Sequence, residues 1–118
     1  MNSSETNLFV STNELRKDHG LRALAQQEPL MDQARSWASA LAAQRALEHS
    51  DPTQWNVAWT AVAENVGAGD SMDEIVQSLQ ASPDHRHNML STKYTHQAVG
   101  TARGKDGRIY AVQLFWRG

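Results

Sequence analysis

Residues 97–116 read QAVGTARGKDGRIYAVQLFW, and this pattern predicts a β-hairpin. The segment Gly104-Lys105-Asp106-Gly107 contains an Asp-Gly pair, which is typical of the turn between two antiparallel strands. We therefore expect strands over 97–103 and 108–116. Both alternating sets of side chains in the second strand are largely apolar: Ile109, Ala111, Gln113 and Phe115, and Tyr110, Val112, Leu114 and Trp116. Such a strand is expected to be covered on both faces.

Helices are predicted before this hairpin. Residues 3–19 place Leu8, Thr12 and Leu15 on one face of a helix. Residues 29–47 are rich in alanine, the best helix former, and Pro29 suits a first turn. The apolar side chains of this second helix repeat along one stripe, at Leu30, Ala34, Trp37 and Leu41.

The middle of the chain is less regular. Residues 53–62 (TQWNVAWTAV) fit a short loop and a strand equally well, and residues 63–70 carry turn formers. A third helix is expected from Ser71, which forms a capping-box pattern with Glu74. Helices followed by a terminal hairpin describe an α+β fold, with helices packed on a small antiparallel sheet.

The composition limits the class of protein. A chain of 118 residues is expected to form a single domain over 1–118, and we expect a monomer. The net charge of −2 argues against nucleic-acid binding, which needs a basic face. There is no cysteine, no apolar run near the ~20 residues of a membrane span, and no signal-peptide pattern at the start. The four tryptophans are expected in the core.

A cluster of polar side chains lies at residues 82–90, SPDHRHNML. Ser82 and Pro83 suit the N-cap and first turn of a short helix. In that helix His85 and Asn88 share one face, whereas His87 points to the opposite side and into solvent. His85 is then a candidate for a site, although a ring that merely bonds a backbone carbonyl is the simpler alternative.

Two further segments combine ionisable groups with turn formers, namely 48–51 (EHSD) and 63–67 (AENVG). His49 is a site candidate, or else a histidine attracted to the C-terminal end of a helix dipole. Glu64 is a second candidate, or else a carboxylate that caps backbone N–H groups in a glycine-rich turn. His19 and His96 are isolated, and we expect no functional role for either.

Taken together, several short motifs resemble one known family. They are N-E-L-R-x-x-H-G-L (13–21), W-A (37–38), H-S (49–50), A-E-N-V-G-x-G-x-S (63–71), S-P-x-H-R-x-N-M-L (82–90), V-G (99–100) and Q-L-F (113–115). The chain resembles the CAP superfamily, named for cysteine-rich secretory proteins, antigen 5 and pathogenesis-related 1, and especially its small bacterial branch. The resemblance implies an α-β-α sandwich, with helices on both faces of an antiparallel sheet, and a secreted or cell-envelope location.

The resemblance also implies a cleft lined by histidine and glutamate side chains. Matching the motifs gives His49, Glu64 and His85 as catalytic or metal-binding residues, with Asn65, Ser82 and Asn88 in support. Two neutral imidazoles and a carboxylate suit Zn²⁺. The family's second glutamate and further histidine are not reproduced. Leu79 stands where bacterial relatives commonly have tryptophan, and His96 is out of register with the family's histidine.

Three functions are compatible with this interpretation. The first is a binding module for a lipid, glycan or cell-envelope component, with or without a divalent metal. The second is a metal-assisted or acid–base hydrolase of peptides or envelope polymers, in which Glu64 and a histidine act together. In the third, the polar cluster only ties loops to the sheet, in a small domain that has no disulfides.

Overall fold

The hairpin predicted from residues 97–116 forms the centre of a four-stranded sheet. A computed structural model describes residues 1–118. The sheet has the strand order β1-β3-β4-β2, so β3 and β4 are the inner strands. The elements follow along the chain as α1 (Ser3–Asp18), β1 (Ala25–Gln26), α2 (Glu28–Gln44), the 3-10 helix η1 (Pro52–Gln54), β2 (Ala61–Gly69), α3 (Met72–Ala81), α4 (Pro83–Leu90), β3 (His96–Arg103) and β4 (Ile109–Arg117).

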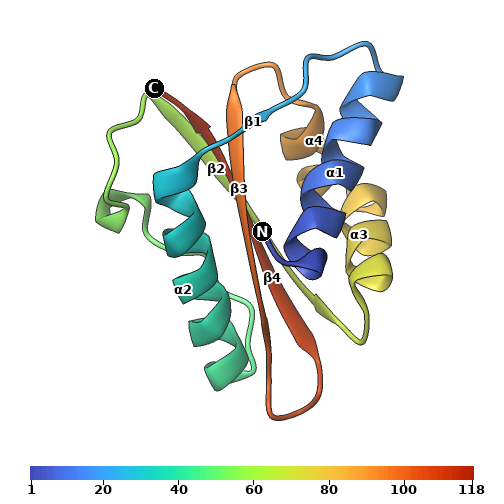
Figure 1. The fold of residues 1–118 in the computed structure, drawn as a ribbon, viewed down its shortest axis with the longest axis vertical. Coiled ribbons are helices and arrows are strands. Elements are labelled where there is room, and N and C mark those ends of the chain that lie inside the picture. Colours follow the sequence, from blue (N-terminus) through green and yellow to red (C-terminus); the bar gives the residue numbers. More distant parts are fainter.

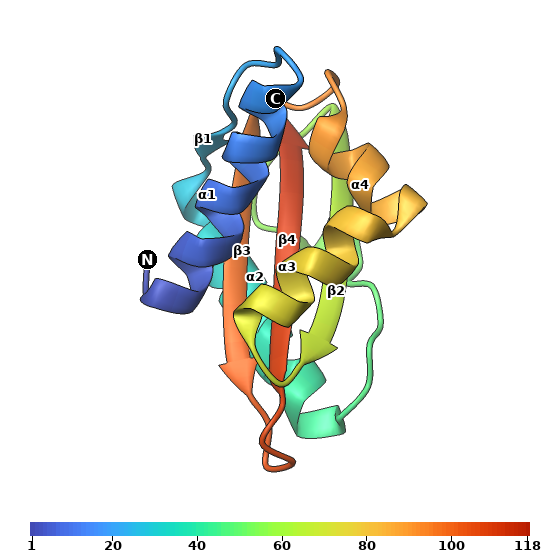
Figure 2. The ribbon, with the colours of Figure 1, turned by 90° about the vertical axis from the view of Figure 1, so that its right-hand side faces the viewer.

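The helices cover both faces of the sheet, as the apolar pattern of residues 108–116 predicts. Helix α2 packs on one face, and α1, α3 and α4 cover the other (Figure 1). The view turned by 90° shows α1, α3 and α4 in front of the strands and α2 behind them (Figure 2). The predicted α-β-α sandwich is therefore confirmed. The sheet is antiparallel except for β1, a two-residue strand that pairs parallel to β3 and that the sequence does not reveal.

The turn predicted over residues 63–70 is wrong, because β2 runs through this segment. It pairs with β4 from Ala61↔Arg117 to Gly69↔Ile109. Its glycines make room for helix α3 instead of forming a turn. A Cβ atom added at Gly69 would lie 3.2 Å from the Ile75 side chain, and one at Gly67 would lie 3.4 Å from it. A glycine in a strand often marks such a close approach.

The glycine of β3 serves a similar purpose on the other face. A Cβ atom at Gly100 would lie 2.4 Å from the backbone of Ala34 and Arg35 in α2. The helix therefore rests directly on the backbone of the strand. Any side chain larger than hydrogen at this position would separate the two layers.

The two helical layers are joined by an ion pair between α1 and α2. The buried carboxylate of Glu5 in α1 accepts two hydrogen bonds from the exposed Arg35 of α2, at 2.8 and 3.0 Å. Burial alone would raise the pKa of Glu5, but the hydrogen bonds from Arg35 and from the Asn2 backbone N–H outweigh it, so the pKa lies below its usual value. Asn2 and Glu5 also form a reciprocal capping box at the start of α1.

The prediction that all four tryptophans lie in the core is correct only for Trp55. Its side chain is buried in the main hydrophobic cluster. Trp37 and Trp116 are half-buried against that cluster, and Trp59 is 39% exposed. None of the helices has both the length and the apolar character that crossing a bilayer requires.

Candidate functional site

The segment between α2 and β2, residues 45–60, carries His49 and is held by all four tryptophans. Each indole N–H donates a hydrogen bond to this segment. The four bonds run from Trp37 to Glu48 O (2.8 Å), from Trp55 to Ser50 Oγ (3.0 Å), from Trp59 to Pro52 O (3.3 Å) and from Trp116 to Ala58 O (3.0 Å). The segment contains no helix or strand except the short η1, so these side-chain bonds stand in for regular backbone pairing.

Glu64 of strand β2 ties the same segment to the sheet. Its side chain is only 6% exposed. Oε1 accepts hydrogen bonds from His49 Nδ1 and from the Ser50 backbone N–H, both at 2.8 Å, and Oε2 accepts one from Ser50 Oγ at 2.6 Å. Three donors thus compensate a buried carboxylate, which would otherwise be costly to remove from water.

The ring of His49 is held on one side and open on the other. Its side chain is 67% exposed although Nδ1 donates to Glu64. A carboxylate that accepts from Nδ1 leaves Nε2 as the acceptor of the neutral ring. The structure therefore brings two of the three predicted site residues together, as an imidazole that Glu64 orients and that is largely exposed to solvent.

His85 reaches the region from helix α4. Its Nδ1 lies 2.9 Å from Ser82 Oγ, three residues earlier. Helix α4 begins as predicted, with Ser82 at the N-cap and Pro83 in the first turn. However, the Ser82 hydroxyl makes no capping bond to the backbone and contacts His85 instead. His87 is exposed, as its position on the opposite side of the helix predicts.

A chain of buried amides supports the backbone of His85. Asn65 is completely buried, and its Nδ2 donates to His85 O (3.1 Å) and to Gln113 Oε1 (3.2 Å). Asn88 donates in turn to Asn65 Oδ1 at 2.9 Å. Gln113 continues the chain toward α1 and β3 by donating to Thr12 Oγ1 and Gln97 Oε1. The predicted supporting positions 65 and 88 thus belong to one network, whereas Gln113 was missed because its strand is otherwise apolar.

A cavity of about 260 Å³ lies at the edge of β2 beside His85. Leu47 closes it from the segment before His49, and Ile75, Leu79 and His85 close it from α3 and α4. Its floor is the strand itself, at residues 66–68. Because β2 is the outermost strand, the cavity lies at the edge of the sheet, between helices α3 and α4 and the segment that follows α2. Leu47 is 48% exposed at the mouth, and nothing in the sequence pattern singles it out.

The zinc site expected from His49, Glu64 and His85 does not fit the donors that the structure brings together. No three His, Asp or Glu side chains of the chain are close enough to hold one metal ion. Both oxygens of Glu64 already accept from Ser50 and His49. His85 makes no hydrogen bond to either of the other two residues. His96, the first residue of β3, contacts the ring of Trp116 edge-on, with 5.0 Å between the ring centres. It takes no part in the site.

This arrangement of helices on both faces of a four-stranded sheet is the fold of a CAP domain. The cysteine-rich secretory protein (CAP) family model matches residues 11–115, and the chain belongs to that family. It is of the bacterial type, as its relatives show.

One curated relative is the protein YkwD of Bacillus subtilis, with 26% identity over 120 residues. The match covers 93% of this chain and 46% of YkwD, so the chain spans about half the length of that relative. Among solved structures, an outer surface protein of Borrelia burgdorferi has a TM-score of 0.89 at 21% identity, covering 98% of this chain and 93% of that one. An extracellular SCP-domain protein of Bacillus anthracis has a TM-score of 0.87 at 23% identity, covering 99% and 41%.

Proposed function

We propose that this domain is a binding module for a ligand with an apolar chain, of the lipid class, at the edge of β2. The observation that carries the proposal is the cavity beside His85, whose walls are largely aliphatic. A glycan would need polar groups along those walls, so the lining favours a lipid among the expected envelope components. In this proposal the exposed ring of His49, two residues beyond Leu47, contacts the polar head group of the ligand.

The exposure of Leu47 supports the same proposal. A leucine that is 48% exposed at the mouth of an apolar cavity leaves hydrophobic area in water that a ligand would cover. Complete burial of a fully exposed leucine contributes about 1.5–3 kcal/mol, and covering the exposed part of Leu47 would contribute about half of that. We further propose that the domain works outside the cell. Support comes from two of its structural neighbours, one described as an outer surface protein and the other as an extracellular protein.

The proposal can be tested by the displacement of a fluorescent fatty acid from the purified domain. We expect saturable binding that Leu47→Glu weakens about tenfold, because a charge at the mouth opposes entry of an apolar chain. Val10→Glu is the matched control, since Val10 is 43% exposed on α1 and lines a different surface hollow. Equal loss in both variants, or no saturable binding by the parent protein, would refute a lipid site at this edge.

A second candidate is an acid–base hydrolase acting on peptides or envelope polymers. It is favoured by one observation, the His49 ring that Glu64 holds by Nδ1 while Nε2 stays free. An imidazole oriented in this way can remove a proton from a water molecule, and the carboxylate stabilises the imidazolium that forms. Ser50 is unsuited to act as a nucleophile, because its hydroxyl donates to Glu64 and accepts from Trp55.

This candidate predicts that His49→Gln abolishes hydrolysis of peptide or cell-wall substrates without unfolding the domain. His87→Gln removes another exposed imidazole from outside the site and should leave any activity unchanged. Turnover that persists in His49→Gln would exclude this mechanism and leave the binding function alone.

A further inference from the structure

Arg16 is a buried cation without a counter-ion. Its side chain lies at the end of α1 and is 3% exposed. Nε donates to Arg22 O (2.8 Å), and Nη1 donates to Met89 O (2.9 Å) and Ser91 O (2.8 Å). All three acceptors are neutral backbone carbonyls, and no carboxylate lies within 4 Å. Burial lowers the pKa of Arg16, which is the effect expected of a charge that has left water and gained no opposite charge.

One nitrogen of this guanidinium remains free. Nη2 makes no hydrogen bond within the protein. No fully buried side-chain nitrogen or oxygen of the chain lacks a partner, so Nη2 must keep contact with solvent. Arg16 lines a cavity of about 440 Å³, a size within the range of small-molecule sites, and we assign the solvent contact of Nη2 to this cavity.

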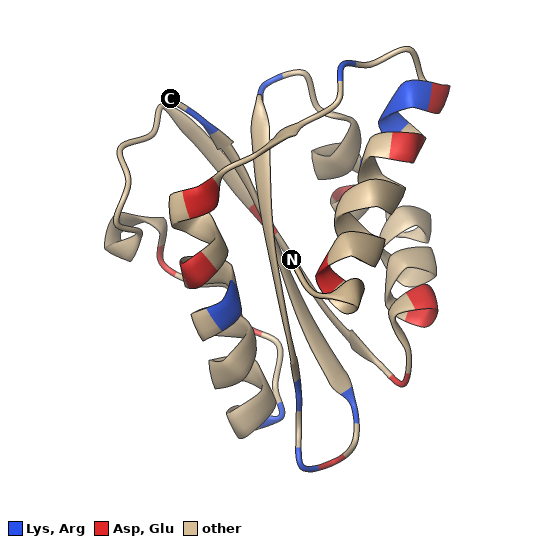
Figure 3. Cartoon of the chain, in the orientation of Figure 1, with Lys and Arg blue, Asp and Glu red and all other residues tan.

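Two further arginines converge on the same cavity from other parts of the chain. Arg22 precedes β1, and Arg117 ends β4. Neither side chain forms an ion pair, and no acidic residue lines the cavity. Thr92 also lines the cavity, and its side chain donates no hydrogen bond within the protein. Figure 3 shows basic segments gathered at this end of the sheet, around the C-terminus and the loops that precede β1 and β3.

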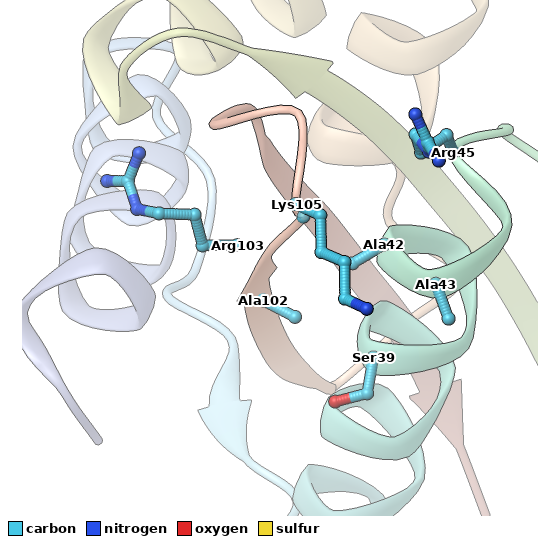
Figure 4. Close-up of a pocket in the computed structure, with 8 residues that line it drawn as sticks. Ser39, Ala42, Ala43, Arg45, Ala102, Arg103 and Lys105 are labelled. Carbon is cyan, nitrogen blue, oxygen red and sulfur yellow. The ribbon is translucent and has the colours of Figure 1, made fainter.

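A second basic cavity, which has no buried arginine, serves as a comparison for the cavity at Arg16. At the opposite end of the sheet, Arg45, Arg103 and Lys105 surround a hollow of about 400 Å³ between α2 and the β3–β4 turn (Figure 4). All three side chains belong to residues that are not buried, and Arg103 bonds to Gly107 O across its own turn. This hollow contains no buried donor. Only the cavity at Arg16 combines a fixed, desolvated guanidinium with two further ones that form no ion pair.

We propose that the cavity formed by Arg16, Arg22 and Arg117 is a binding site for a phosphate monoester, separate from the site at the edge of β2. A phosphate monoester carries about −1.5 to −2 charges at pH 7 and presents three strong acceptor oxygens. Three cations that approach from three segments match this charge and this number of acceptors better than they match a carboxylate. Charge-assisted bonds from arginine are among the strongest that a protein makes to phosphate.

The test is a titration of the full chain with inorganic phosphate at constant ionic strength, followed by calorimetry and by amide NMR shifts. We expect saturable binding with shifts centred on residues 16, 22 and 92. Arg22→Gln/Arg117→Gln should weaken it about tenfold or more, because charge-assisted hydrogen bonds are lost. Arg16→Gln would remove three bonds that hold the fold, so the other two arginines carry the test.

The matched control is Arg45→Gln/Lys105→Gln, which removes the same charge from the other basic cavity. Phosphate affinity should stay within about twofold of the parent protein, since the two cavities lie at opposite ends of the sheet and salt screens charges beyond about 8–10 Å. Equal weakening in both double variants would overturn the proposal, because it would show attraction by net charge alone. Absence of saturable binding to the parent protein would overturn it as well.

Two sources of the phosphate group can be separated in the same series. Co-sedimentation with vesicles containing phosphatidic acid, compared with phosphatidylcholine alone, tests a lipid head group. Binding to the acidic vesicles that Arg22→Gln/Arg117→Gln abolishes assigns the site to a membrane phosphate. Binding of inorganic phosphate and glycerol phosphate without vesicle binding assigns it to a soluble ester.

Discussion

Helix α4 and the segment 45–60 each deliver one histidine to the edge of β2, but they are positioned in different ways. His85 is placed by its own neighbours, because Ser82 and Pro83 set the start of the helix and Ser82 also contacts the ring. His49 is placed by distant residues, because Glu64 of the edge strand bonds to its ring and Trp37 of α2 and Trp116 of β4 bond to the segment that carries it. The position of His85 can therefore be predicted from the nine residues 82–90, whereas the position of His49 depends on contacts across the whole fold.

The largest effect on stability is expected from Glu64→Gln, which removes the carboxylate that holds His49 and Ser50 from a distant strand. An amide cannot accept from all three donors that the carboxylate satisfies, so at least one buried donor loses its partner. We expect a loss of about 2–4 kcal/mol in the free energy of unfolding, measured with urea. Glu48→Gln is the control, because the Glu48 side chain is exposed and makes no bond. A loss of similar size in the control would show that the charge of the segment, and not this carboxylate, matters.

Trp55→Phe should be the next most severe change. It removes the indole N–H bond to Ser50 Oγ and leaves a small void in the core, at a cost of about 1–2 kcal/mol. The change should also speed amide hydrogen exchange at residues 49–51. Trp59→Phe is the comparison, because Trp59 is 39% exposed and its bond to Pro52 O is longer, at 3.3 Å. If Trp59→Phe proved the more destabilising, the ranking of the four indoles by burial would be wrong.

Ser82→Ala tests whether His85 is positioned by its neighbours in α4 alone. The His85 ring loses its contact with the hydroxyl, and we expect a cost of about 0.5–1 kcal/mol with a changed ring environment in histidine NMR spectra. The segment 45–60 should be unaffected. Faster exchange at residues 49–51 in this variant would mean that the two histidines are coupled and that the contrast between local and distant positioning does not hold.

The smallest effect is expected from His49→Ala. With 67% of its side chain exposed, the ring contributes less than about 0.5 kcal/mol to stability through its bond to Glu64. Unfolding in urea should therefore be almost unchanged, while ligand binding or hydrolysis at the site is affected. A large loss of stability would support the view that the polar cluster only ties the loop to the sheet.

Much of the architecture was predictable because its signals are local. The apolar stripe of residues 29–47 and the Asp-Gly turn at 106–107 act over a few residues, and the structure has a helix and a hairpin there. Strand β2 was not predictable, since its glycines and its Glu-Asn pair indicate a turn until α3 and β4 are present to explain them. Two-residue β1 is too short to leave any periodicity.

The same distinction between local signals and distant contacts applies to the candidate site. The resemblance to known motifs led to the prediction of His49, Glu64 and His85, but it did not indicate their hydrogen-bond partners. In the sequence, Ser50 was only part of the H-S motif, whereas in the structure it donates two hydrogen bonds to Glu64. Likewise, Arg16 belongs to a motif that supported only the family resemblance, and its missing counter-ion is visible only when the acceptors around it are known.

The arrangement of the four indoles makes the intrinsic tryptophan fluorescence of this protein a probe of one segment, residues 45–60. Because every tryptophan donates to the segment that carries His49, nearly all of the ultraviolet-excited emission originates next to one loop. A ligand that displaces the loop changes the surroundings of several emitters at once, so its binding can be followed without any attached dye. The same property separates two events that are usually confused: unfolding of α1, which has no tryptophan, leaves the emitters in place, whereas opening of the loop changes their signal directly.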